Sequence, residues 1–175
     1  LISGGVLQSS RSYDIGTVRL LEGRVKEESV ASLRNDMREL GAGHPGLRII
    51  GSGGNINKLY RLAAAGCKNG MELPVSELSV INGVLKSMSS EERVRVFRMR
   101  PDRADVITFA ADIFLEIAGQ CGASVILVPT IGLADGIIDS FMPRMRSGQA
   151  GVDSFSCRRW RLRIFRRGCG VTAPC

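Results

Sequence analysis

Residues 47–59 constrain the fold more than any other part of this 175-residue chain. A largely apolar run at 47–50 is followed directly by a glycine-rich turn and by a helix-forming segment from about Asn55. Because glycines can adopt positive φ and carry no Cβ, successive backbone N–H groups can converge there on an anion. The order of strand, turn and helix therefore predicts a phosphate-binding loop, made of Gly51, Ser52, Gly53, Gly54 and Asn55.

A packing role is the alternative for the same glycines. The pattern G-x-G-G also occurs in tight strand-to-helix turns that bind nothing. A helix N-terminus contributes about 0.3 to 1 kcal/mol per anionic group, so a single loop holds a phosphate only weakly. A working site needs a second loop or a metal ion, and the loop alone does not decide between the two interpretations.

Charge is distributed unevenly along the chain. Residues 1–142 hold 16 basic and 16 acidic side chains, whereas residues 143–175 hold eight arginines and a single aspartate. The whole net charge of +7 therefore lies in the last segment. A basic balance ordinarily suggests nucleic acid or an anionic surface as the partner, and here that inference applies to the tail only.

Cysteine usage and hydropathy exclude several classes of protein. The five cysteines are odd in number and form no C-x-x-C pair, which argues against a structural zinc site or a disulfide framework. The apolar runs are too short to span a bilayer, and no secretory start is present. We therefore expect a cytoplasmic protein with reduced thiols and no membrane partner.

Strand and helix patterns alternate along the chain. With 44% hydrophobic and 5% aromatic residues, the composition suits a folded domain. This order predicts an α/β protein with helices packed on a central mixed sheet, and the short apolar run at 123–129 is typical of a buried parallel strand. The expected elements are a hairpin at 1–13, helices at 22–40 (ending at Gly41), 55–65, 75–85, 91–97 (after Ser89 or Ser90), 103–119 and 133–142, and the strand at 123–129.

Four motifs in this order resemble the exopolyphosphatase and guanosine pentaphosphatase family. The family shows S-[FY]-x-x-G-x-V-R-L, then G-[ST]-G-G-[TN], then R-x-D-V-I, and finally G-L-x-[DE]-G-[IL]. These patterns stand here at residues 12–20, 51–55, 103–107 and 132–137. The resemblance covers roughly residues 1–142 and none of the tail.

The resemblance implies a fold and an activity. The fold would be one ribonuclease H-like lobe of the actin-like ATPase superfamily, incomplete at its N-terminus. The family releases phosphate from polyphosphate or guanosine pentaphosphate, with Mg²⁺ between two lobes. The implied partners are thus polyphosphate or a guanosine nucleotide, and a homodimer is left open.

The chain departs from the family pattern in two ways, and these limit which of the family's functional residues can be assigned here. The family's D-x-G-G-G-S loop and its catalytic glutamate would lie upstream of Leu1, so we expect this chain alone to be inactive. Asn55 also stands where many relatives carry Thr. No catalytic residue is assigned.

Four further residues are secondary candidates for the site. Lys58 lies one turn into the helix and could reach a phosphate, although a solvated lysine is an equal alternative. Arg19 could face the cleft from a strand end or form a surface ion pair. Arg103 and Asp105 lie in the first turn of a helix, where Asp is favoured in any protein.

Three functional hypotheses follow. The first is part of a phosphoanhydride hydrolase over residues 1–142. The second is a non-catalytic lobe that binds nucleotides or alarmones through the same loop. The third is nucleic-acid binding through residues 143–175, where arginines alternate with Trp160 and other apolar residues, although the abrupt change in composition favours a tail outside the fold.

Overall fold

The computed structural model describes residues 1–63 and 70–129. These residues belong to two units, a hairpin within Leu1–Ser12 and a larger unit that begins at Tyr13. The predicted helix at 133–142, the motif at 132–137 and the basic tail at 143–175 lie outside the described residues.

The hairpin joins β1 (Ile2–Ser3) to β2 (Val6–Leu7) in antiparallel register. Gly4 and Gly5 both have positive φ, +58° and +79°, as a two-residue hairpin turn requires. The predicted hairpin is confirmed, but its second strand ends at Leu7 rather than near Tyr13.

The larger unit contains a three-stranded mixed sheet. Its strands are β3 (Ile49–Ile50), β4 (Glu72–Pro74) and β5 (Val125–Leu127), in the order β3-β5-β4. The pair β3 and β5 is parallel, as the sequence predicts, whereas β4 runs antiparallel to β5. The sheet thus brings the glycine loop after β3 next to the end of β5.

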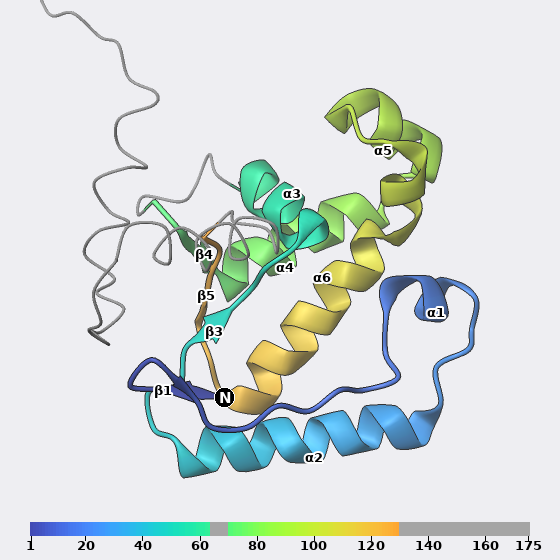
Figure 1. Ribbon diagram of the computed structural model, residues 1–175. Coiled ribbons are helices and arrows are strands. Elements are labelled where there is room, and N and C mark those ends of the chain that lie inside the picture. Colours follow the sequence, from blue (N-terminus) through green and yellow to red (C-terminus); the bar gives the residue numbers. More distant parts are fainter. Residues whose placement is uncertain (64–69, 130–175) are drawn as a thin grey trace, which may run out of the picture. The chain divides into compact units, whose positions relative to one another are not determined.

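Six helices accompany this sheet in the described part of the unit (Figure 1). The longest of them, α6, packs against the other five. Buried alanines along α6, such as Ala104 and Ala111, leave room for that close packing. The helices are α1 (Thr17–Leu21), α2 (Glu27–Gly43), α3 (Gly54–Ala63), α4 (Val75–Lys86), α5 (Ser90–Phe97) and α6 (Pro101–Cys121).

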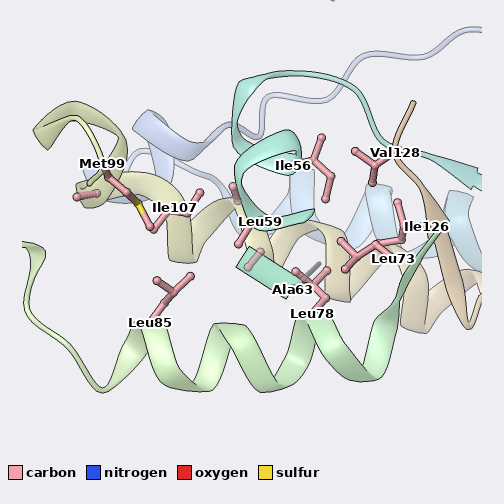
Figure 2. Packing of buried hydrophobic residues seen from close by; sticks show 13 residues of the cluster. Ile56, Leu59, Ala63, Leu73, Leu78, Leu85, Met99, Ile107, Ile126 and Val128 are labelled. Carbon is pink, nitrogen blue, oxygen red and sulfur yellow. The ribbon is translucent and has the colours of Figure 1, made fainter. Parts of the chain in front are cut away.

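One hydrophobic cluster joins α3, α4, α6 and the sheet (Figure 2). Ile56 and Leu59 of α3 and Ile126 of β5 are at most 1% exposed. Burying a side chain of this size contributes roughly 1.5 to 3 kcal/mol. The cluster fixes the first turn of α3 at the end of β3, and therefore fixes the glycine loop between them.

Most of the predicted helices are confirmed, with two corrections. The helix expected at 22–40 runs instead over Glu27–Gly43, so Gly41 lies inside it rather than capping it. Arg19 lies in α1 and not at a strand end, because residues 17–21 form a short helix. The predicted starts of α5 and α6 are confirmed. Ser89 forms a capping box at the start of α5, and Pro101 is the first residue of α6.

Candidate functional site

Gly51 directly follows β3 and serves packing. Its N–H donates to the carbonyl of Leu127 at 2.8 Å, and the residue is buried. A Cβ at this position would lie 2.9 Å from Ile56 Cγ1 and 3.2 Å from both Ile126 and Phe114. Gly51 therefore has a packing role, and its contact with a phosphate stays a prediction.

Gly53 makes the turn into α3. Its φ of +114° is a conformation that residues with a Cβ rarely adopt, and nothing lies within 4 Å of the place a Cβ would take. Its carbonyl accepts from the N–H of Asn57 at 3.1 Å, which begins the helical hydrogen bonding. Ser52, Gly53 and Gly54 are exposed, so this part of the loop is open to a ligand.

Gly54 lies against the guanidinium of Arg103. A Cβ on Gly54 would stand 2.8 Å from Arg103 Nη2 and 3.6 Å from its Cζ, and no other group is that close. Arg103 comes from the first turn of α6 and is partly buried. Within residues 1–63 and 70–129 its guanidinium has neither a hydrogen bond nor an ion pair, so its charge is available at the loop.

The first turn of α3 also carries two asparagines. Asn55 is partly buried beside the open part of the loop. Asn57 was not among the predicted site residues, yet its Oδ1 is buried without a hydrogen-bond partner among the described groups. An unsatisfied buried acceptor costs about 1 to 3 kcal/mol, which makes Asn57 a further residue to test. The sequence signal for it is a second asparagine two residues after the end of the loop motif.

The other secondary candidates have partners elsewhere. Lys58 Nζ donates to the carbonyl of Phe97 at 2.8 Å, at the end of α5. Asp105 accepts a hydrogen bond from the hydroxyl of Ser90 at the start of α5. Arg103 is the candidate that lies against Gly54, and a direct role of each candidate at a phosphate stays a prediction.

Arg19 forms an exposed ion pair. Its Nη2 lies 3.6 Å from Asp14 Oδ1, and its side chain is 52% exposed. An ion pair this exposed contributes about 0 to 1 kcal/mol. The surface alternative therefore accounts for Arg19 as the structure describes it.

The residues described do not supply a metal site. Among them, no three His, Cys, Asp or Glu side chains gather in a way that could hold a metal ion. Backbone N–H groups and the Arg103 guanidinium are donors, which suit an anion and repel a cation. The Mg²⁺ implied by the resemblance therefore has no ligand set in this part of the chain.

No helix in the described residues has the length and hydropathy needed to cross a bilayer.

Comparison with known proteins gives structural matches. No protein-family model matches the sequence, and no curated protein does so. A Ppx/GppA family member from Aquifex aeolicus is similar in structure, with a TM-score of 0.64 and 26% identity over 83% of this chain and 52% of that one. The type II variant of the Aquifex aeolicus Ppx/GppA phosphatase gives 0.62 and 27% identity, over 79% of this chain and 51% of that one.

An exopolyphosphatase from Cytophaga hutchinsonii shares the fold at lower identity. Its TM-score is 0.59 at 16% identity, covering 76% of this chain and 49% of that one. These neighbours confirm the resemblance that the four motifs indicate. The chain spans about half the length of each of these structures.

Proposed function

We propose that this chain forms the phosphate-binding lobe of an enzyme that hydrolyses phosphoanhydride bonds. The substrate in this proposal is inorganic polyphosphate or guanosine pentaphosphate. The main support for this proposal is the contact between Arg103 and Gly54. It places a guanidinium at the N-terminal turn of α3, beside an exposed loop. Similarity to Ppx/GppA structures supports the reaction class.

Charge neutralisation is the contribution that this loop would make. The N–H groups of Ser52, Gly53 and Gly54 and the positive end of α3 would hold phosphate oxygens. Arg103 would add charge-assisted hydrogen bonds to the same group. Phosphoryl transfer depends chiefly on such positioning and electrostatic stabilisation, so binding residues of this kind contribute directly to the rate.

Activation of the attacking water is not assigned to this chain. Asp105, the acidic candidate, already accepts a hydrogen bond from Ser90. We propose that the base comes from the rest of a full-length cytoplasmic enzyme, in which this lobe is one half of a ribonuclease H-like pair. We include Mg²⁺ and a homodimer in the proposal only because the family resemblance implies them. No residue described here is assigned to bind Mg²⁺ or to form a dimer interface.

A non-catalytic lobe that binds nucleotides or alarmones is the second candidate. The absence of a clustered carboxylate set from the described residues favours it. The same donors would bind a pyrophosphate group whether or not a water is activated. Under both candidates we expect the 175-residue chain with Mg²⁺ to bind without turnover, and robust phosphate release would refute that expectation.

Calorimetric titration of two glycine variants tests the loop. A Cβ on Gly54 would meet only the flexible end of Arg103, so Gly54→Val should fold while displacing the guanidinium. We expect the affinity for polyphosphate and for guanosine nucleotides to fall about tenfold or more. Gly83→Ala is the matched control, because nothing lies within 4 Å of its Cβ position in α4.

Equal affinities for Gly54→Val and the unaltered chain would contradict the proposal. Thermal unfolding of each variant shows whether the fold is retained. Binding through the tail would instead be steeply salt-dependent and would vanish on deletion of residues 143–175. A loss of phosphate binding on that deletion, with Gly54→Val unaffected, would move the site from the loop to the tail.

A further inference from the structure

Lys58 joins the helix of the glycine loop to α5. Its Nζ donates to the carbonyl of Phe97 at 2.8 Å, and this contact is partly buried. Phe97 is the last residue of α5, where the carbonyl groups of a helix have no partner within it and a cation is favoured by the helix dipole. The ammonium group of Lys58 therefore satisfies the C-terminus of α5.

Two side chains of α5 bind α6 next to Arg103. The Nη1 of Arg93 donates to the carbonyl of Ala104 at 2.9 Å. The hydroxyl of Ser90 donates to the carboxylate of Asp105. Because both acceptors directly follow Arg103 in the sequence, α5 holds α6 immediately after the residue whose guanidinium lies against the glycine loop.

α5 thus bridges the two sides of the contact between Gly54 and Arg103. It is bound to α3 through Lys58, and to the start of α6 through Arg93 and Ser90. No residue of α5 is fully buried, although two of them pack partly against the core cluster, so the polar contacts contribute to its attachment. Hydrogen bonds from charged donors are the stronger class, which favours Lys58 and Arg93 as the main attachments.

We propose that Lys58 is a positioning residue that acts through α5 to hold the Arg103 guanidinium against Gly54. The inference rests on the proposed function, in which Arg103 and the glycine loop bind the same phosphate. Lys58 does not touch the phosphate in this role, because its Nζ is bound to Phe97. Without this bond α5 and the first turn of α6 are free to shift away from α3, and Arg103 moves away from the loop.

NMR of the arginine side chains in the ligand-free chain tests the position of Arg103. Its Nε–H signal is assigned by its disappearance in Arg103→Met. Lys58→Met keeps an apolar stem and removes the donor, so we expect it to shift this signal and to lower its heteronuclear NOE as the guanidinium becomes more mobile. Lys58→Arg keeps a charged donor and should restore most of the signal. An Arg103 signal that is the same in Lys58→Met and in the unaltered chain would overturn the proposal.

A double-mutant cycle tests whether Lys58 affects binding through Arg103. Calorimetric titration with tripolyphosphate compares the 175-residue chain with Lys58→Met, Arg103→Met and the double variant. We expect Lys58→Met to bind about three- to tenfold more weakly, and the double variant no more weakly than Arg103→Met. Losses that multiply in the double variant would mean that Lys58 binds the phosphate itself or disturbs the whole loop. That result, or an unchanged affinity of Lys58→Met, would overturn the proposal.

Arg61→Met is the matched control for loss of one positive charge from α3. Arg61 is exposed in the last turn of this helix and has neither a hydrogen bond nor an ion pair among the described residues. The variant should leave the Arg103 signal and the affinity unchanged. An effect as large as that of Lys58→Met would show a general charge effect and overturn the positioning role.

The remaining outcomes separate this inference from the proposed function. If thermal unfolding shows that Lys58→Met does not fold, Ser90→Ala removes an exposed bond of the same bridge, and an unchanged Arg103 signal there overturns the proposal. If the unaltered chain binds no tripolyphosphate, the proposed function fails. The ligand-free signal still decides in that case whether Lys58 positions Arg103.

Discussion

Gly41 of α2 lies directly against the backbone of Cys121 at the end of α6. A Cβ on Gly41 would stand 2.8 Å from the carbonyl oxygen of Cys121 and 2.9 Å from its Cα. The two helices therefore meet at backbone distance, and the side-chain pairs Arg34–Glu116 and Arg38–Gln120 follow the same contact. Glycine at this position serves close packing between helices rather than the end of a helix.

Gly41→Ala should destabilise the fold. The added methyl group would meet backbone atoms that cannot rotate away, and overpacking of this kind costs about 1 to 3 kcal/mol. Urea unfolding measures the loss. Gly43→Ala is the control in the same helix, since its Cβ position is open. It should leave stability unchanged or raise it by up to about 1 kcal/mol through helix propensity, and equal stabilities for the two variants would contradict the packing role.

Acid should weaken the contact between α2 and α6. The Arg34 guanidinium and the Gln120 amide donate to Glu116 and lower the pKa of its carboxyl. A carboxyl with a lowered pKa stabilises the fold at neutral pH, and this contribution is lost as the pH falls through the folded-state pKa. The side chains of Arg34 and Glu116 are 48% and 33% exposed, so solvent screening keeps the effect small.

Glu116→Gln isolates that acid dependence. The variant should be less stable than the unaltered chain at about pH 7, and the difference should shrink toward about pH 3. Urea midpoints at the two pH values give the comparison. A difference that does not change with pH would mean that the ionised pair contributes nothing to the contact.

The sequence predicts the elements whose signals are local. The glycine turn before α3, the serine cap of α5 and Pro101 at the start of α6 are each set by neighbouring residues. The strand β4 at Glu72–Pro74 was not predicted, because three residues that include a proline carry no periodicity and their conformation depends on pairing with β5. Gly41 was misassigned because its role depends on a helix far away in the sequence.

The candidate site likewise contains residues that local sequence predicts and residues whose position depends on tertiary packing. The loop residues follow from the strand, glycine and helix order, whereas the contact of Arg103 with Gly54 depends on how α6 packs against α3. The partners of Lys58 and Asp105 depend equally on the place of α5. Sequence spacing names such residues as candidates, and only tertiary packing decides which of them reach the loop.

Replacing Arg93 should loosen the helices around the core. Its Nε donates to the carbonyl of Leu85 at 2.7 Å and its Nη1 to that of Ala104 at 2.9 Å, so it joins the end of α4 to the start of α6. Arg93→Met leaves both partly buried carbonyls without this donor, at a cost of about 1 to 3 kcal/mol. Arg95→Met, at an exposed position of the same helix, is the control and should stay within about 0.5 kcal/mol.

Loss of the serine cap should unfold α5 before the rest of the unit. Ser89 accepts from the N–H of Glu92 at 3.2 Å, and the Glu92 carboxylate accepts from the Ser89 N–H at 2.7 Å. Ser89→Ala removes the first of these bonds and costs about 1 kcal/mol, whereas Ser89→Asp keeps an acceptor and should cost less. Hydrogen exchange should then quicken in α5 and leave β5 protected. Uniform exchange throughout the unit would contradict this local role.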